Sequence, residues 1–280
     1  MLVSLKYVLD LAEKGNFAIP AFNVYNMESV MGVLKAAEEA KAPIIMQVYP
    51  RLMKEETGYF LSPIIKAAAE KASVPVCFHL DHGPSELETT RSIRYGATGI
   101  MLDGSTLPFE ENIALTKRVV DTCSYLGIQV EGELGHVGMT SDSDMDEFTT
   151  PEDAKKFIDE TGVSCLAIAV GTAHGRYKKP PKLDIERIKA IRAATNNAAL
   201  VLHGGSGVPD EEIKKAVAAG IRKMNFATDI CYSFLDTCLV ELQKPDRAIA
   251  IDTFMKKPIE AIKEFCISRI KLVGADNKAN

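Results

Sequence analysis

The sequence predicts a closed barrel of eight parallel β-strands, each followed by a helix, as a single domain spanning residues 1–280. Two observations support this prediction. Short apolar segments alternate with longer segments of helical spacing through nearly the whole chain. The apolar segments lack strict alternation, which is typical of strands that are buried on both faces of a parallel sheet. We therefore expect an α/β fold, a (β/α)8 TIM barrel with extra C-terminal helices.

Each expected strand is a short apolar run bounded by turn residues. The runs lie at residues 17–22, 43–49, 74–80, 99–103, 128–134, 165–170, 198–203 and 221–227. Eight β-then-α units with right-handed connections close most naturally into a barrel. An open doubly wound sheet is the alternative, and it usually carries a G-x-G-x-x-G motif after its first strand. No such motif follows the first run.

The segments between the runs have the spacing of amphipathic helices. They lie at residues 27–41, 85–96, 111–127, 151–162, 184–195 and 209–220. Pro151 and Gly162 frame one of these helices, and Pro209 and Gly220 frame another, as expected for helix starts and ends. Residues 251–274 add helical sequence that a barrel does not need, so we expect this segment to wrap the barrel or to join a subunit interface.

The composition indicates a small-molecule partner. The net charge is −5 and the two signs are interspersed, so no block of charge suggests binding to nucleic acid or to a membrane surface. The N-terminal segment lacks the layout of a signal peptide, and no apolar run approaches the ~20 residues of a membrane span. The six cysteines are scattered without a C-x-x-C pair, which favours reduced thiols. We expect a cytoplasmic protein.

Histidines cluster at the expected ends of strands. His82, His174 and His203 each follow a predicted strand and are each followed by glycine. Barrels build their active sites at this rim, and three imidazoles are sufficient to hold a catalytic divalent metal with an open position. For any one histidine alone, a hydrogen-bonded structural role is the simpler interpretation. We interpret His79 as a structural or supporting residue and leave the role of His136 open.

Acidic residues and a glycine-rich turn lie at the same rim. Asp81 precedes His82, and it is either a proton-transfer group or a partner that orients a histidine. Glu131 and Glu133 alternate onto one face of a strand, where they either reach the site or pair with a lysine or arginine. Residues 203–213, HGGSGVPDEEI, run from a strand into a helix, which is a common phosphate site in barrels.

Five motifs in order then indicate a family. They are HLDHG (79–83), EGELG (131–135), GTAHGRYK (171–178), LHGGSG (202–207) and NFATD (225–229). Together they resemble the class II, metal-dependent ketose-bisphosphate aldolases, which include fructose- and tagatose-bisphosphate aldolases. Residues 21–26 and 269–280 are similar too, so the resemblance covers essentially the whole chain.

The resemblance implies a lyase of carbohydrate metabolism that reversibly cleaves a phosphorylated ketose to dihydroxyacetone phosphate and an aldehyde through a metal-stabilised enediolate. It implies one Zn²⁺ held by His82, His174 and His203, with Asp81 as the catalytic acid and base. It also implies a monovalent cation, Na⁺ or K⁺, near the phosphate, and a homo-oligomer, either a dimer or a tetramer. Residues implied to contact the substrate are Asn23, Gly175, Lys178, Gly204, Ser206, Asn225 and Thr228, with Glu133 nearby.

Two departures from the family pattern bear on the substrate. Fructose-bisphosphate aldolases of this class carry an aspartate and an arginine where this chain has Ala227 and Cys231. Loss of the arginine removes the usual bidentate contact with a second phosphate, so we do not expect fructose 1,6-bisphosphate to be the best substrate. Arg51 and Arg176 are candidates for binding a different anion.

The second departure lies in the loop over residues 136–148, which has no glutamate at the family's proton-transfer position. Asp142 and Asp144 are the nearby candidates for moving the substrate's α-proton. Lys223 is the one lysine worth testing as a Schiff-base nucleophile. A metal-dependent sugar-phosphate isomerase or epimerase, and a non-catalytic binding barrel, are the alternative functions on the same scaffold.

Overall fold

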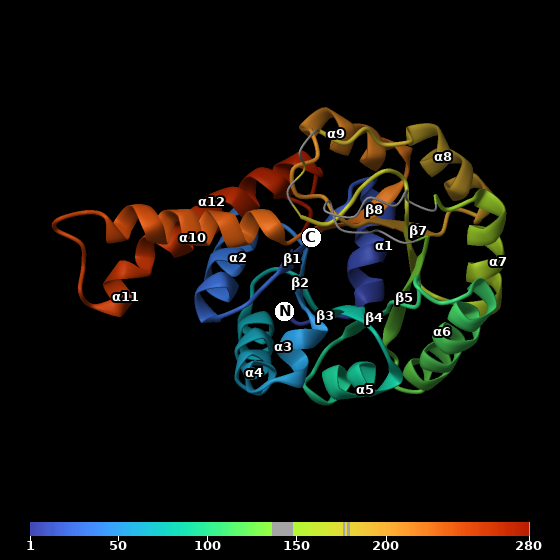
Figure 1. Cartoon of the computed structure of the whole chain (residues 1–280), viewed down its shortest axis with the longest axis horizontal. Helices are drawn as coiled ribbons and strands as arrows, with labels where there is room; N and C mark the ends of the chain where they lie inside the picture. Colours follow the sequence, from blue (N-terminus) through green and yellow to red (C-terminus); the bar gives the residue numbers. More distant parts are fainter. Residues whose placement is uncertain (136–147, 176, 178–179, 280) are drawn as a thin grey trace.

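The computed structural model describes residues 1–135, 148–175, 177 and 180–279. Eight parallel strands form a closed barrel in sequence order, and β1 pairs with β8 to close it (Figure 1). The strands are β1 (Ile19–Asn23), β2 (Ile44–Val48), β3 (Val76–Gly83), β4 (Gly99–Leu102), β5 (Gln129–Leu134), β6 (Cys165–Ile168), β7 (Ala199–Leu202) and β8 (Ile221–Phe226). The predicted α/β barrel is confirmed.

Helices surround the barrel and cover the outer faces of its strands (Figure 1). Within the described residues they are α1 (Leu5–Gly15), α2 (Met27–Ala40), α3 (Pro50–Lys54), α4 (Glu56–Lys71), α5 (Glu86–Arg94), α6 (Phe109–Ser124), α7 (Pro151–Thr161), α8 (Ile185–Ala194), α9 (Asp210–Ala219), α10 (Thr228–Leu242), α11 (Ile251–Phe254) and α12 (Lys256–Leu272). In the part of the chain that the structure describes, no helix is both long and apolar enough to span a membrane.

The predicted helix punctuation is present. Thr150 caps α7 by accepting a hydrogen bond from the Asp153 backbone N–H, Pro151 is its first residue, and Gly162 ends it with a φ of 72°. Such a cap stabilises a helix by about 1 kcal/mol. Pro209 and Gly220 flank α9, where Pro209 is the N-cap residue without a side-chain hydrogen bond and Gly220 has a φ of 121°. These short-range signals fix where each helix returns the chain to the next strand.

Helix α1 was not predicted, and it closes the end of the barrel where the strands begin. Its buried face, which includes Leu5, Val8 and Ala12, packs against β1, β3 and β8. The opposite end, where the strands finish, carries the polar residues described below. The bottom of the barrel is therefore covered by a helix and its top is available for a site.

The C-terminal helices extend to one side of the barrel (Figure 1). Helix α12 packs on α2, and α10 lies along α12. We expected this extra helical sequence either to wrap the barrel or to join a subunit interface, and α12 packs on the barrel. A subunit interface stays a prediction.

Candidate active site

Three histidines meet at the rim where the strands end. His82 is the second-to-last residue of β3, His203 directly follows β7, and His174 lies in the loop between β6 and α8. The ring centre of His82 is 4.9 Å from that of His174 and 4.5 Å from that of His203. One ring nitrogen from each of the three lies within 4.8 Å of the others. The structure thus brings together the three predicted metal ligands.

The backbone at two of these positions requires special geometry. Gly204 has a φ of 64°, and a Cβ on it would lie 2.4 Å from the carbonyl oxygen of Ala173. Only glycine lets the loops that carry His174 and His203 cross this closely. At β3 it is His82 itself, not the glycine after it, that adopts a positive φ, of 50°. At the end of β3 the positive φ therefore lies at the histidine, one residue before the glycine.

Each of two histidines uses one ring nitrogen to contact a carboxylate. His82 Nδ1 is 2.7 Å from Asp103 Oδ2, and His203 Nε2 is 2.8 Å from Glu131 Oε1. The remaining nitrogens, His82 Nε2 and His203 Nδ1, face one another at 2.8 Å. A carboxylate behind each histidine is the usual support of a histidine metal ligand, because it fixes the tautomer and the ring orientation.

The negative charge around His82 favours a cation in this position. Carboxylate oxygens of Asp103, Glu133 and Asp81 lie 2.7, 3.7 and 4.0 Å from its ring nitrogens. Burial alone would lower the pKa of His82, but the carboxylates, that of Asp81 first, outweigh burial and raise it to about 10. Buried carboxylates need a compensating positive charge, which a proton on His82 or a divalent metal can supply. The donor set therefore fits a metal ion.

Asp81 is held by two amides. Asn23 Nδ2 donates to Asp81 Oδ2 at 2.8 Å, and Asn225 Nδ2 donates to Asp81 Oδ1 at 3.0 Å. Gln47 in turn donates to Asn23 Oδ1 at 2.8 Å. Amide donors on both oxygens fix the orientation of the Asp81 carboxylate at the end of β3.

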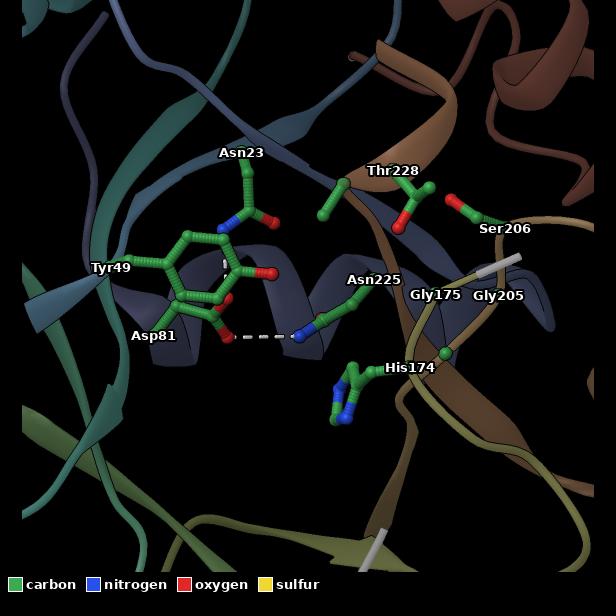
Figure 2. A pocket seen from close by; sticks show the side chains of 11 residues that line it. Asn23, Tyr49, Asp81, His174, Gly175, Gly205, Ser206, Asn225 and Thr228 are labelled. Carbon is green, nitrogen blue, oxygen red and sulfur yellow. Dashed lines mark hydrogen bonds between the residues drawn. The ribbon is translucent and has the colours of Figure 1, made fainter. Parts of the chain in front are cut away.

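Asp81 also opens onto a pocket (Figure 2). The residues that line this pocket are Asn23, Tyr49, Asp81, His174, Gly175, Gly204, Gly205, Ser206, Asn225, Ala227 and Thr228. Ser206 and Thr228 lie on the side opposite Tyr49, and α10 begins at Thr228. Ser206 Oγ also accepts the backbone N–H of Asp229 at 3.3 Å, so the two loops are tied together. The N-terminus of a helix and glycine-rich backbone at one side of a pocket form a suitable anion site.

The structure places most of the sequence-predicted residues at this pocket. Glu133 is buried, with Oε2 3.7 Å from His203 Nδ1, so it reaches the site. Glu131 does both, because its Oε1 contacts His203 and its Oε2 pairs with Lys223 Nζ at 2.9 Å. His79 is fully buried, and its Nε2 lies 3.5 Å from Glu131 Oε2. The residues that lie outside the described part of the chain are His136, Asp142, Asp144, Arg176 and Lys178.

Sequence reasoning did not single out two residues of the site. Asp103, one residue after β4, supports His82; burial raises the pKa of its carboxyl group, but the contacts with His82 and Ser105 together outweigh burial and lower it. Tyr49, one residue after β2, points its hydroxyl group into the pocket beside Asp81 (Figure 2). Both follow the end of a barrel strand, and that position was the signal that could have identified them.

Of the two positions that depart from the family pattern, one lines the pocket and the other lies in a separate apolar hollow. Ala227 lines the pocket directly. Cys231 is half-buried and forms part of an apolar hollow with Tyr25 and Phe234. The Arg51 guanidinium group lies 5.3 Å from the centre of the Tyr49 ring, so it stacks on this pocket residue.

The fold and the rim together define the class of protein: a β/α-barrel enzyme with metal-ligating and proton-transferring groups at the ends of its strands. The chain belongs to the class II fructose-bisphosphate aldolase family, whose model matches residues 3–278. It is therefore an aldolase, a carbon–carbon lyase, and not an isomerase or a binding barrel. Class II aldolases are generally metal-dependent and act on sugar phosphates.

Solved structures agree with this assignment. The YdjI aldolase from Escherichia coli K12 is 37% identical, with a TM-score of 0.90 over 100% of both chains. A putative fructose-1,6-bisphosphate aldolase from Coccidioides immitis is 28% identical, with a TM-score of 0.87 over 98% of this chain and 97% of that one. The fold is also that of fructose-bisphosphate aldolase from Campylobacter jejuni, at 24% identity and a TM-score of 0.83 over 99% of this chain and 97% of that one.

Proposed function

We propose that this aldolase uses Zn²⁺ and reversibly cleaves a phosphorylated ketose to dihydroxyacetone phosphate and an aldehyde. The observation that carries the proposal is the set of three converging imidazoles beside buried carboxylates. His82, His174 and His203 would hold the ion, since three histidines with an open fourth position are typical of catalytic zinc. When bound, the metal supplies Lewis-acid polarisation of the ketose carbonyl, which is worth several kcal/mol.

Asp81 moves the proton that bond cleavage requires. Its carboxylate lies at the pocket, is almost fully buried, and is held in place by the amides of Asn23 and Asn225. In the cleavage direction it accepts the proton of the substrate hydroxyl group on the carbon that becomes the aldehyde. In the synthesis direction it returns that proton. Asn225 has the position to contact the neighbouring substrate oxygen, because its amide lines the same pocket.

The glycine-rich side of the pocket would bind the phosphate group. Gly175, Gly204 and Ser206 face Thr228 across this side, and the N-terminus of α10 adds its positive end. Lys178 and a monovalent cation belong to the same proposal. Binding the phosphate here places the carbons of the ketose between the histidines and Asp81.

Two substituted positions argue against a second phosphate group. Ala227 lines the pocket and the half-buried Cys231 lies in the apolar hollow, where related enzymes use a carboxylate and an arginine. A thiol and a methyl group offer no bidentate donor for phosphate. We infer that a ketose 1-phosphate is a better substrate than fructose 1,6-bisphosphate.

A panel assay tests this function. Fructose 1-phosphate, sorbose 1-phosphate, fructose 1,6-bisphosphate and tagatose 1,6-bisphosphate are offered separately, and release of dihydroxyacetone phosphate is measured with and without EDTA. We expect cleavage that EDTA abolishes and Zn²⁺ restores, with the highest kcat/KM for a 1-phosphate. Cleavage of no member by protein that holds one zinc per chain would refute the proposal, and a preference for fructose 1,6-bisphosphate would refute its substrate part.

An Asp81→Asn variant is the matched control. The amide keeps the size of the side chain but cannot accept the proton, so kcat should fall by about a hundredfold or more. Its zinc content should equal that of the wild type, because Asp81 is not one of the proposed ligands. A variant that cleaves at the wild-type rate would remove Asp81 from the mechanism.

A further inference from the structure

Lys223 is a buried cation to which the proposed reaction gives no role. It lies on β8, two residues before Asn225, and its side chain has no exposed surface. Its ammonium group is 2.9 Å from Glu131 Oε2 and 2.7 Å from Asn225 Oδ1. Removing two opposite charges from water costs more than their attraction usually returns. A fully buried ion pair beside an active site therefore calls for a reason other than stability.

We propose that Lys223 is a positioning residue that sets the orientation of the Asn225 amide and the hydrogen-bonding state of Glu131, and through them prepares Asp81 and His203. The proposal rests on the metal site and on the role of Asp81 proposed above. It gives one side chain control of both halves of the site, the acid–base group and a metal ligand.

The first branch runs from Lys223 to Asp81. An ammonium group has donors only, so the Asn225 amide must turn its oxygen toward Lys223. The NH₂ group of the same amide must then point away, and it donates to Asp81 Oδ1 at 3.0 Å (Figure 2). Without the ammonium group, the Asn225 oxygen loses its partner, and only the hydrogen bond to Asp81 opposes a rotation that would present this oxygen to the carboxylate. That rotation would replace an attraction by a repulsion.

The second branch runs from Lys223 to His203. A carboxylate paired with an ammonium group acts as an acceptor, so Glu131 Oε1 receives the proton on His203 Nε2 across 2.8 Å. The tautomer with Nε2 protonated leaves a lone pair on Nδ1, the nitrogen that faces His82. That lone pair is what a metal ion binds, so the lysine determines which nitrogen of His203 is ready for the metal.

The geometry assigns Lys223 this role in place of a Schiff-base nucleophile. Its nitrogen is engaged by two acceptors at short distance. Because strand residues two apart lie on the same face, Lys223 sits deeper in the barrel than Asn225, whose amide lines the pocket. A substrate carbonyl would have to displace Asn225 to reach the amine.

Paired variants test the proposal. Lys223→Met removes the positive charge and leaves Glu131 without its cation. The thermal unfolding temperature of this variant should therefore fall below that of the wild type. The double variant Lys223→Met with Glu131→Gln removes both charges together and should recover much of that loss. Metal-free forms are titrated with Co²⁺ against a competing chelator, and kcat and KM are measured with the ketose phosphate that the wild type cleaves.

We expect the double variant to bind Co²⁺ about 10- to 100-fold more weakly than the wild type, the usual effect of losing a carboxylate that supports a histidine ligand. Its Co²⁺ absorption spectrum should change, and kcat should fall at least tenfold with KM within about threefold, because the lost positioning acts on the reacting groups. Wild-type Co²⁺ affinity, spectrum and kcat in a double variant that folds would overturn the proposal.

A measurement on the wild type does not depend on how the variants fold. Histidine-selective ¹⁵N labelling of the metal-free protein should show His203 with its proton on Nε2, with the signal assigned by its loss in a His203→Asn variant. A proton on Nδ1 would overturn the proposal. If the wild type shows the expected tautomer yet binds no Co²⁺ at the rim, the metal site fails and the role of Lys223 toward Asp81 stands.

Discussion

Two clusters of charged side chains lie at opposite ends of the same barrel. At the end where the strands begin, Glu13 accepts hydrogen bonds from Arg192 at 2.8 Å and from Arg222 at 3.1 Å. At the other end, Asp81, Glu131 and their neighbours surround three histidines. Both clusters are largely buried and both join elements that are far apart in the sequence.

The difference between the clusters lies in whether their charged groups are satisfied by partners within the fold. In the Glu13 cluster each arginine also donates to other acceptors: Arg222 Nη2 reaches Asn16 Oδ1 at 3.2 Å, and Arg192 reaches the carbonyl oxygen of Ala198. At the rim, carboxylates crowd one histidine and raise its pKa to about 10, against the effect of burial. The Glu13 cluster, whose charged groups are paired within the fold, serves stability, whereas a group of carboxylates that shifts the pKa of a histidine marks a functional site.

The largest expected effect comes from breaking the rim. His174→Ala removes one proposed ligand, and the loss of several kcal/mol of Lewis-acid stabilisation should lower kcat/KM at least about a thousandfold. Zinc content per chain should fall in the same preparation, measured by atomic absorption. The unfolding temperature of the metal-free protein should change little, and a large fall would mean that His174 serves the fold first.

Breaking the Glu13 cluster should have the opposite effect: stability should fall and activity should not. Glu13→Ala leaves Arg192 and Arg222 without their shared carboxylate and should lower the free energy of unfolding by about 2 kcal/mol in urea titrations. The values of kcat and KM should match those of the wild type, since no described contact links Glu13 to the pocket. Lost activity in folded protein would contradict the separation of the two ends.

His79 allows a finer test of the charge cluster at the rim, because its ring is fully buried next to Glu131. Burial, helped by the charge of Lys223, lowers its pKa to about 3, so the unfolded chain takes up a proton below pH 6.5 that the folded protein refuses. Stability therefore falls as the pH drops below 6.5, by about 1.4 kcal/mol per pH unit from this residue. In the described structure neither ring nitrogen has a hydrogen-bond partner.

His79→Leu should accordingly flatten the acid limb of the stability curve. At pH 7.5 the variant and the wild type should differ little, and at pH 5 the variant should be the more stable by about 2 kcal/mol. Urea unfolding at the two pH values measures both differences. An equal gap at the two values would show that His79 does not carry this proton linkage.

The strands could be predicted because buried strands are recognisable by their apolar residues. Residues 165–170 were expected as a strand and β6 spans Cys165–Ile168, since a strand covered on both faces is apolar along its length. Helix α1 and helix α4 were missed for opposite reasons. The first precedes the repeating pattern, and the second contains Pro63, which argues against a helix in a local reading.

The site was predictable as far as its residues follow strand ends. His82 and His203 sit beside glycines at such ends, so the sequence alone was sufficient to predict that they meet. The pairing of Glu131 with Lys223 could not be predicted, because β5 and β8 are not neighbours and meet only across the closed interior. Asp103 was missed for a related reason, since its role depends on the unusual backbone of His82.

Residues two apart on one strand, such as Lys223 and Asn225, supply successive depths of the barrel interior. Insertion or deletion of a single residue within β8 would send both side chains to the outside and bring their apolar neighbours in. Lineages that carry this enzyme can therefore change length in the loops beyond the strands, and with it the aldehyde they accept. They can hardly tolerate a change of length within a strand. Alignments of relatives should therefore show gaps in the loops and not within the strands.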